Sequence, residues 1–224
     1  MKLTGIVLAA GRSSRLGRDK LAVTMPGGRS LAAWTLEAAL GSSALANVVC
    51  VVKPEDDLRW VPSEWMGEAN ARNSSASVRI RQTKLQLTAC TDDREGMANS
   101  LRCGIQAAMQ TRPEGVVILL ADQPLLQSRH IDLVARVLAE DPLLDYSAAM
   151  DDTPGDFGKP PIAFRCHMME RLLLLHGDEG ARTVLREPCY KGGQVILPDF
   201  AFWDADTEPQ LARIIDFAER AQVK

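Results

Sequence analysis

The sequence predicts an α/β fold in which helices cover a mostly parallel central sheet. One observation is the continuous apolar run from Leu3 to Ala10, which Gly11 ends. A second is the run from Gly115 to Ala121, the most strand-like in the chain. Strands of a parallel sheet are buried on both faces, so they appear as unbroken apolar runs rather than alternating ones. A third is the helical spacing of residues 30 to 40, which places a helix after the first strand.

The first three elements form a strand–helix–strand unit. Ser30 is the expected N-cap of the helix, and Gly41 stands just past its end. Val48 to Val52 is the second strand, which we expect to be parallel to the first, with a right-handed crossover. The loop after the first strand then opens at the carboxyl edge of the sheet, where ligands of such sheets bind.

Periodicity and capping residues predict the later elements. A helix opens in the block from Gly96 to Ile105, with Asn99 or Ser100 as its cap. Ser128 is the expected cap of the next helix, and His130 is interpreted as a surface residue at its exposed start. The remaining expected elements are short strands at 78–80, 146–150 and 195–197 and a last helix behind a capping box of Thr207 and Gln210.

Composition restricts the class of protein. The chain has 224 residues and a formal net charge of −3, which argues against nucleic acid as its main partner. No apolar stretch approaches the roughly 18 residues that a membrane span needs. The five cysteines include no C-x-x-C pair and have no histidine at metal-ligand spacing, so neither a zinc site nor a disulfide framework is indicated. We expect reduced thiols in a cytoplasmic protein.

The loop from Gly11 to Lys20 has the composition of a phosphate-binding segment. It contains two glycines, two serines and four cations, which together offer exposed backbone N–H groups beside positive charge. It is not a Walker loop, because Gly11 and Gly17 enclose five residues and Arg18 follows. The dinucleotide pattern G-x-G-x-x-G is also absent, so the loop is suited to a polyphosphate in another way.

The pattern Leu-Ala-Ala-Gly-x-Ser-x-Arg-x-Gly-x-x-Lys, from Leu8 to Lys20, resembles the signature loop of nucleotidyltransferases. Within them it looks most like the molybdenum cofactor cytidylyltransferases. Matching blocks occur near the start, middle and end, so the resemblance implies a single three-layer, Rossmann-like nucleotidyltransferase domain over residues 1–224. The nucleotide-binding residues that it implies are Leu8, Ala9, Ala10, Gly11, Ser13, Arg15, Lys20, Gly96 and Ser100.

Two acids are candidate metal ligands. Asp122 ends the strand at 115–121 and faces the same edge as the first loop, where Mg²⁺ can take one or two carboxylates and complete its shell with phosphate and water. The resemblance implies the same role. Asp206 is the second candidate, with capping of the last helix as an alternative, since Glu208 interrupts the family pattern. Gln123 and Ala10 are typical of the branch that uses CTP rather than GTP.

Two further blocks resemble the acceptor side of these enzymes. One contains Gly158 and Pro161, and the doubled proline leaves its alignment open. The other contains Gly180 and Arg182 in a turn before an expected helix, whose N-terminus could bind an anion.

The reaction implied is attack by the acceptor's terminal phosphate on the α-phosphorus of CTP, which releases pyrophosphate. The resemblance assigns Arg15 to the β- and γ-phosphates, Lys20 to the α-phosphate, and Asp122 with Asp206 to Mg²⁺; such catalysis consists of positioning and charge neutralisation. The implied partners are CTP, a molybdopterin-type phosphorylated acceptor and a recipient molybdoenzyme or its chaperone. A guanylyltransferase, a sugar-1-phosphate nucleotidyltransferase and a non-catalytic nucleotide sensor remain alternatives.

Overall fold

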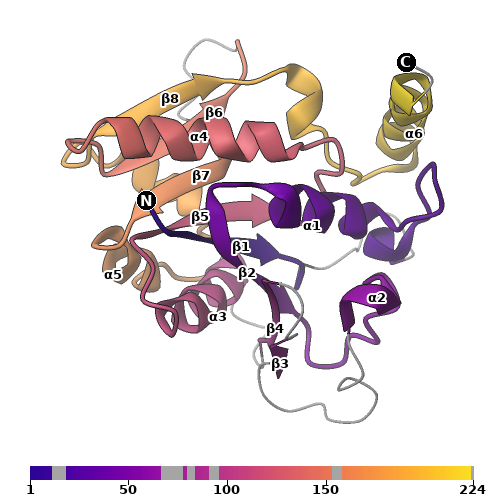
Figure 1. The fold of residues 1–224 in the computed structure, drawn as a ribbon, viewed down its shortest axis with the longest axis horizontal. Helices are drawn as coiled ribbons and strands as arrows, with labels where there is room; N and C mark the ends of the chain where they lie inside the picture. Colours follow the sequence, from indigo (N-terminus) through magenta and orange to yellow (C-terminus); the bar gives the residue numbers. More distant parts are fainter. Residues whose placement is uncertain (12–18, 67–77, 80–83, 91–95, 153–157, 223–224) are drawn as a thin grey trace.

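The computed structural model describes residues 1–11, 19–66, 78–79, 84–90, 96–152 and 158–222. They form an eight-stranded sheet in the order β3-β4-β2-β1-β5-β7-β6-β8 (Figure 1). The pairs β1–β2, β1–β5, β2–β4 and β6–β8 are parallel, and the pairs β3–β4, β5–β7 and β6–β7 are antiparallel. The strands are β1 (Leu3–Leu8), β2 (Leu45–Val52), β3 (Val78–Arg79), β4 (Leu85–Ala89), β5 (Gly115–Leu120), β6 (Tyr146–Met150), β7 (Lys159–Arg165) and β8 (Gly192–Ile196). The α/β prediction is confirmed.

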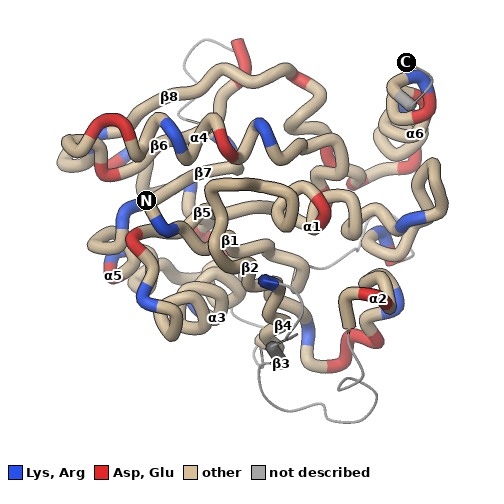
Figure 2. Tube along the Cα trace, in the orientation of Figure 1, with Lys and Arg blue, Asp and Glu red and all other residues tan. Residues whose placement is uncertain are grey.

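Helices cover both faces of this sheet, which gives three layers. The α-helices are α1 (Leu31–Gly41), α2 (Ser63–Met66), α3 (Met97–Met109), α4 (Ser128–Glu140), α5 (Met168–Leu173) and α6 (Glu208–Gln222), and the 3-10 helices are η1 (Lys20–Ala22), η4 (Ala181–Arg186) and η5 (Asp199–Phe202). Helices α1 and α4 share one core cluster with the sheet, and α3 and α5 share another (Figure 1). Acidic and basic residues are interspersed along the described chain (Figure 2), in keeping with its small net charge.

The two cores explain the unbroken apolar run of β1. Val7 packs in the cluster that contains Leu36 of α1, whereas Ile6 packs in the cluster that contains Leu101 of α3. Successive side chains of a strand point to opposite faces, so both must be apolar here. At Gly104 of α3 a Cβ atom would collide with the side chains of Ile6 and Val51. Only a glycine lets α3 approach the sheet this closely.

The strands β1, β2 and β5 end at one edge of the sheet. Leu8 lies opposite Val51 on one side and Leu120 on the other, all three in parallel pairs. The predicted parallel pairing of the first two strands is therefore confirmed. Strand β7 runs antiparallel to β5, with Ile162 opposite Ile118, so β7 begins at this same edge. The segments that follow β1, β2 and β5 thus meet the segment that precedes β7.

Several local predictions are wrong. The strand β4 was not expected, and β2 begins at Leu45 rather than at Val48. Gly96 is the N-cap residue of α3, with a φ of 72° and no side-chain cap, so neither Asn99 nor Ser100 caps it. The N–H of Ala98 instead donates to the carbonyl of Gly177, at 3.0 Å. A contact distant in sequence has replaced the local cap.

The second cap also differs from the prediction. Gln127, not Ser128, is the N-cap residue of α4. His130 is buried, with only 2% of its surface exposed, and its Nδ1 accepts a hydrogen bond from the N–H of Gln127 at 3.3 Å. The interpretation of His130 as a surface residue is therefore wrong. Phe200 of η5 lies 6.1 Å away, between ring centroids, and contributes to covering this end of the helix.

The cysteines are not all reduced thiols. Cys90, just after β4, forms a disulfide with Cys103 of α3, whereas Cys50, Cys166 and Cys189 are free. This corrects the expectation of five thiols, because only the packing of α3 beside β4 brings two cysteines 13 residues apart into contact. A bilayer-spanning helix is not found in the described part of the chain, where each helix is too short or too polar.

Candidate active site

Lys20 lies between two carboxylates at the carboxyl edge of the sheet. Its Nζ donates to Oδ2 of Asp122 at 2.7 Å and to Oδ1 of Asp206 at 2.6 Å. These partners are 102 and 186 residues away in sequence. The structure thus brings together three residues that the sequence singled out separately. Their functional roles stay predictions.

Each of the three is held by a nearby element. Asp122 lies two residues after the end of β5. The N–H of Ala121 between them donates to the carbonyl of Leu8 at 3.1 Å, which joins this segment to the end of β1. Lys20 opens η1, whose N-cap Asp19 accepts a hydrogen bond from the N–H of Leu21. Lys20 therefore projects from a short, capped helix rather than from a free loop.

Asp206 is positioned by an apolar cluster that also includes residues near Lys20 and Asp122. Ala205 beside it is fully buried, and the buried members of this docking cluster are Met25, Leu31, Leu125, Ala205, Leu211, Ile214 and Ala218. Met25 follows η1, Leu125 follows Asp122, and the last three lie on α6. Hydrophobic burial of α6 therefore fixes where Asp206 stands relative to the other two residues.

The charges of this group affect one another. Burial lowers the pKa of Lys20, but the charge of Asp122 and hydrogen bonds to Asp122 and Asp206 outweigh it, so the pKa lies above its usual value. The Lys20 side chain is 11% exposed, and those of Asp122 and Asp206 are 23% and 36% exposed. Asp204 lies close enough that burial and the charges of Asp206 and Asp122 raise its pKa. Lys20 is a cation that partly neutralises an acidic site.

The donor set fits a divalent cation of the magnesium type. Asp122 and Asp206 each place a carboxylate oxygen beside the Nζ of Lys20. The two oxygens therefore face a common point where positive charge is favoured. Magnesium takes one or two protein carboxylates and fills its shell with water and substrate phosphate. Among the described residues no group of three or more His, Cys, Asp or Glu side chains is arranged to hold a metal.

The end of β1, which was expected to bind nucleotide, lies near Lys20. Ala9 and Gly11 line a recess of about 250 Å³ together with Asp19, Lys53 and Asp56. The N–H of Ala9 is bonded to the carbonyl of Val51, so the backbone here continues the sheet. Leu8 and Ala10 flank Ala9, the first half-buried and the second buried. Ser13 and Arg15 lie outside the described residues.

The start of α3 contacts the turn that was assigned to the acceptor. A Cβ atom at Gly96 would collide with Asp178 and with the carbonyl of Gly177, and one at Gly180 would lie 2.8 Å from the sulfur of Met97. Ser100 lies half-buried on the following turn of α3. The segment predicted to bind nucleotide and the segment predicted to line the acceptor side are therefore adjacent.

The other acceptor residues lie at the start of β7 and in η4. Gly158 is buried with a φ of 107°, and Pro161 is buried within β7 and joined to Pro160 by a cis peptide bond. A Cβ atom at Gly158 would lie 3.3 Å from the side chain of Leu185, in η4. Arg182 is exposed in the first turn of η4. The expected helix is a six-residue 3-10 helix, so the helix N-terminal anion site is not supported.

Sequence reasoning missed two features of this edge. Asp204 was not among the expected metal ligands, although burial and the charges of Asp206 and Asp122 raise its pKa. Gln123 is 5% exposed. Among the described residues, its Oε1 is the one buried side-chain nitrogen or oxygen atom that has no hydrogen-bond partner. An unmade hydrogen bond costs about 1–3 kcal/mol, so a ligand or water that donates to Gln123 would be favoured. The spacing of Asp204 from Asp206 was the available signal.

Comparison with known proteins identifies the family. The model of the MobA-like NTP transferase domain matches residues 5–193. The chain belongs to the MobA-like NTP transferase family. It is also 32% identical over 195 residues to the purine catabolism protein PucB of Bacillus subtilis (strain 168), an alignment that covers 87% of this chain and 85% of that protein. The protein is thus a nucleotidyltransferase, and a nucleoside triphosphate is its implied substrate.

Solved structures share the fold of this family member. Rv0371c of Mycobacterium tuberculosis H37Rv aligns with a TM-score of 0.71 and 22% identity, over 96% of this chain and 99% of that one. A manganese complex of Rv0371c aligns with a TM-score of 0.63. CMP:2-keto-3-deoxy-manno-octonic acid synthetase in complex with CTP aligns with a TM-score of 0.67 and 14% identity, over 99% and 100% of the two chains. The nucleotidyltransferase fold predicted from the sequence is confirmed.

Proposed function

We propose that this protein transfers CMP from CTP to the terminal phosphate of a molybdopterin-type acceptor and releases pyrophosphate, with Mg²⁺ as cofactor. The observation that carries the proposal is the contact of Lys20 with both Asp122 and Asp206 beside the loop that follows β1. An ammonium group next to two carboxylates supplies a cation for phosphate oxygens and oxygen ligands for a metal, which support nucleotidyl transfer.

The proposed roles of the site residues are electrostatic, because each fixes a charge near the phosphates or the metal. Lys20 supplies the cation for the α-phosphate, and its raised pKa keeps it charged throughout the neutral range. Asp122 and Asp206 would hold the metal, and bound magnesium supplies neutralisation and polarisation of phosphate oxygens. We assign Arg15 to the β- and γ-phosphates and the Ala9–Gly11 backbone to the nucleotide. The acceptor phosphate itself is the nucleophile, so no protein nucleophile is needed.

Two residues favour CTP over GTP. Ala10 and Gln123 are typical of the cytidylyl branch that the sequence resembles, and Gln123 has an unpaired buried acceptor beside Asp122. A donor on either base or a bound water would satisfy this acceptor, so the preference for CTP rests on the resemblance. The CTP complex of a structural relative supports the compatibility of this fold with CTP.

The sequence resemblance and the relative in purine catabolism support the proposed acceptor. The name of the Bacillus protein places that relative in purine breakdown. We extend this to the present chain and propose that the activated cofactor is delivered to a molybdoenzyme of purine breakdown, or to its chaperone, in the cytoplasm. Gly158, Pro161, Gly180 and Arg182 would then line the acceptor side.

A pyrophosphate-release assay tests the proposal directly. The protein is incubated with Mg²⁺, one of CTP, GTP, ATP or UTP, and either purified molybdopterin cofactor or a sugar 1-phosphate. We expect release with CTP and molybdopterin, and its loss when EDTA removes the metal. Preference for GTP would favour a guanylyltransferase, and release with the sugar phosphate alone would favour a sugar nucleotidyltransferase. Binding of CTP without pyrophosphate release from any acceptor would favour a sensor.

A further inference from the structure

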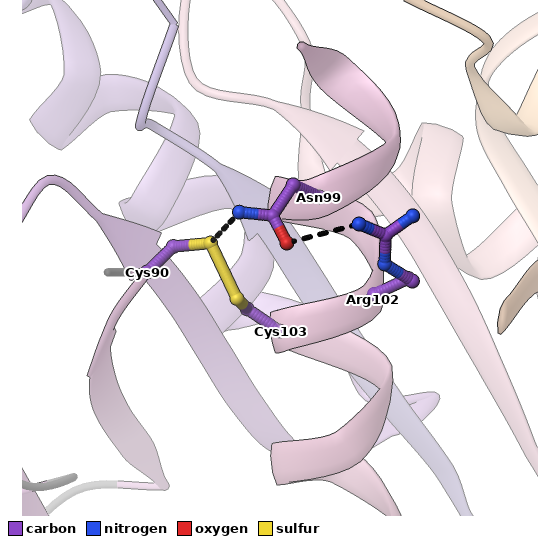
Figure 3. Close-up of a disulfide and its surroundings, with 4 residues drawn as sticks. All are labelled: Cys90, Asn99, Arg102 and Cys103. Atoms are coloured by element: carbon purple, nitrogen blue, oxygen red, sulfur yellow. Dashed lines mark hydrogen bonds between the residues drawn. A yellow bond between two sulfur atoms is a disulfide. The ribbon is translucent and has the colours of Figure 1, made fainter. Parts of the chain in front are cut away.

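The disulfide between Cys90 and Cys103 has two chemically different sulfur atoms. Cys90 follows β4 and is buried, with 2% of its surface exposed, whereas Cys103 on α3 is partly exposed. Figure 3 shows the bond between the two sulfur atoms. The Cα atoms of the two residues are 5.8 Å apart. A thiol in solution can therefore reach Cys103 more easily than Cys90. Attack at Cys103 makes Cys90 the leaving group.

Polar side chains beside Cys90 offset part of the cost that its burial imposes on a leaving thiolate. Asn99 donates from Nδ2 to the Sγ of Cys90 at 3.2 Å, and its Oδ1 accepts from Arg102 at 3.3 Å (Figure 3). Arg102 is held in turn by a 2.7 Å hydrogen bond to the carbonyl of Leu175. A hydrogen bond donated to sulfur favours its charged form, and a nearby guanidinium polarises the amide that donates it. A more stable thiolate leaves faster.

We propose that Cys90 and Cys103 are a reversible redox site that small dithiols open and disulfide oxidants close. One thiolate of the dithiol attacks the sulfur of Cys103, which breaks the protein disulfide and releases Cys90 as a thiolate. The second thiolate attacks the reagent's own sulfur in the mixed disulfide and releases Cys103. The products are a cyclic reagent disulfide and two protein thiols, which carry the two protons of the dithiol. Glutathione disulfide reverses the change and leaves as two molecules of glutathione.

The disulfide closes a loop of the chain that contains the segment assigned to the nucleotide. This loop couples the redox site to nucleotide binding. The 13-residue separation between the two cysteines spans Gly96 to Ser100, and Ser100 is three residues before Cys103 in α3. This coupling rests on the proposed function, because it assigns that segment to the nucleotide. Opening the bond gives the segment more freedom in the unliganded protein, and binding must then order it at greater entropic cost. The reduced protein should bind nucleotide more weakly.

Reduction kinetics test the redox site without any catalytic assay. The oxidised protein is treated with dithiothreitol, the thiols are trapped with iodoacetamide, and intact mass counts them. We expect the number of trapped thiols to rise by two, and reduction of the Asn99→Ala variant to be about tenfold slower because Cys90 leaves less readily. Cys166→Ser, which removes an exposed free cysteine, is the matched control and should keep the wild-type rate. The proposed redox site would be refuted if the oxidant-treated protein lacked the disulfide. It would also be refuted if dithiothreitol reduced wild type and Asn99→Ala at equal rates.

Calorimetry with CTP tests the coupling. We expect the wild-type protein to bind CTP about fivefold more weakly after reduction, in line with a modest preorganisation effect. The Cys90→Ser/Cys103→Ser variant should bind like the reduced protein and not respond to dithiothreitol. Equal affinity of the two wild-type forms would refute the coupling. Absence of CTP binding in both forms would refute the proposed function and the coupling with it, while the mass experiment judges the redox site separately.

Discussion

Lys20 is held by carboxylates that come from the middle and from the end of the chain. The raised pKa of Lys20 means that its ion pairs contribute stability below its usual pKa and lose that contribution only as the pH rises through the higher folded value. Under physiological conditions the group is therefore a fixed cation. The residue is better suited to neutralising phosphate than to transferring a proton.

Replacement of Lys20 should separate catalysis from stability. We expect Lys20→Met to lower kcat by roughly 10²- to 10³-fold, because it removes one charged group that stabilises the transition state. Lys84 is the matched control, a part-buried lysine whose Nζ donates to the carbonyls of Ser42 and Leu45. Lys84→Met should lower the free energy of unfolding but keep kcat. Steady-state pyrophosphate release and urea unfolding measure both; near-normal turnover of Lys20→Met would remove Lys20 from the mechanism.

His130 should make the protein sensitive to mild acid. Burial and the charge of Arg129 lower its pKa, so the folded protein keeps it neutral while the unfolded chain binds a proton below about pH 6.5. Its contribution to stability is present above that pH and is lost as the pH falls toward the folded pKa. We expect wild type to lose more stability than His130→Asn as the pH falls below about 6.5, with a difference in slope of at most about 1.4 kcal/mol per pH unit. Urea unfolding at several pH values measures this, and parallel pH profiles of the two proteins would contradict it.

At the scale of elements, α3 is the helix whose placement has the most consequences. It packs on β1 and β2 through Gly104, it holds Cys103, and its first turn is bonded to the Gly177 carbonyl. Sequence periodicity located this helix, but a cap at Asn99 or Ser100 would start it three or four residues after Met97, where it begins. It could not identify its cap, because the partner of the Ala98 N–H comes from a turn about 80 residues later rather than from a local side chain.

A larger side chain at Gly104 should destabilise the packing of α3 on the sheet. Gly104→Val places atoms where Ile6 and Val51 already stand, and overpacking of this kind costs about 1–3 kcal/mol. Gln106→Val is the control, because Gln106 is exposed on the same helix and carries the same β-branched cost. Chemical denaturation compares the free energies of unfolding. Equal losses in the two variants would mean that α3 can move away from the sheet at no cost.

At the scale of the whole molecule, the candidate site depends on how α6 docks. The docking cluster joins α6 to segments near Lys20 and Asp122, so a helix at the end of the chain sets the position of Asp206. The sequence indicated Asp206 only through a family pattern interrupted at Glu208. Its distance to Lys20 follows from burial of apolar side chains that come from several separate segments of the chain.

Weakening that cluster should reduce both stability and turnover. Leu211 of α6 is 2% exposed, and Leu211→Ala should cost about 2–5 kcal/mol through lost burial and the cavity left behind. We also expect kcat to fall at temperatures where the variant is still folded, because Asp206 is then less firmly placed. Glu219→Ala, at an exposed position of α6, should change neither quantity. Full turnover by a destabilised Leu211→Ala would show that the site does not depend on this docking.

The sequence by itself determined the α/β class, the strands β1 and β5, the helix α1 with its Ser30 cap, and the identity of the residues at the carboxyl edge. These follow from apolar periodicity and turn residues, which act over a few neighbouring positions. Only the tertiary structure decided the contact of Lys20 with Asp122 and Asp206, the burial of His130 and the pairing of Cys90 with Cys103. Each of these depends on how separate helices pack on one sheet, and packing is set by the combined shape of distant side chains rather than by any local pattern.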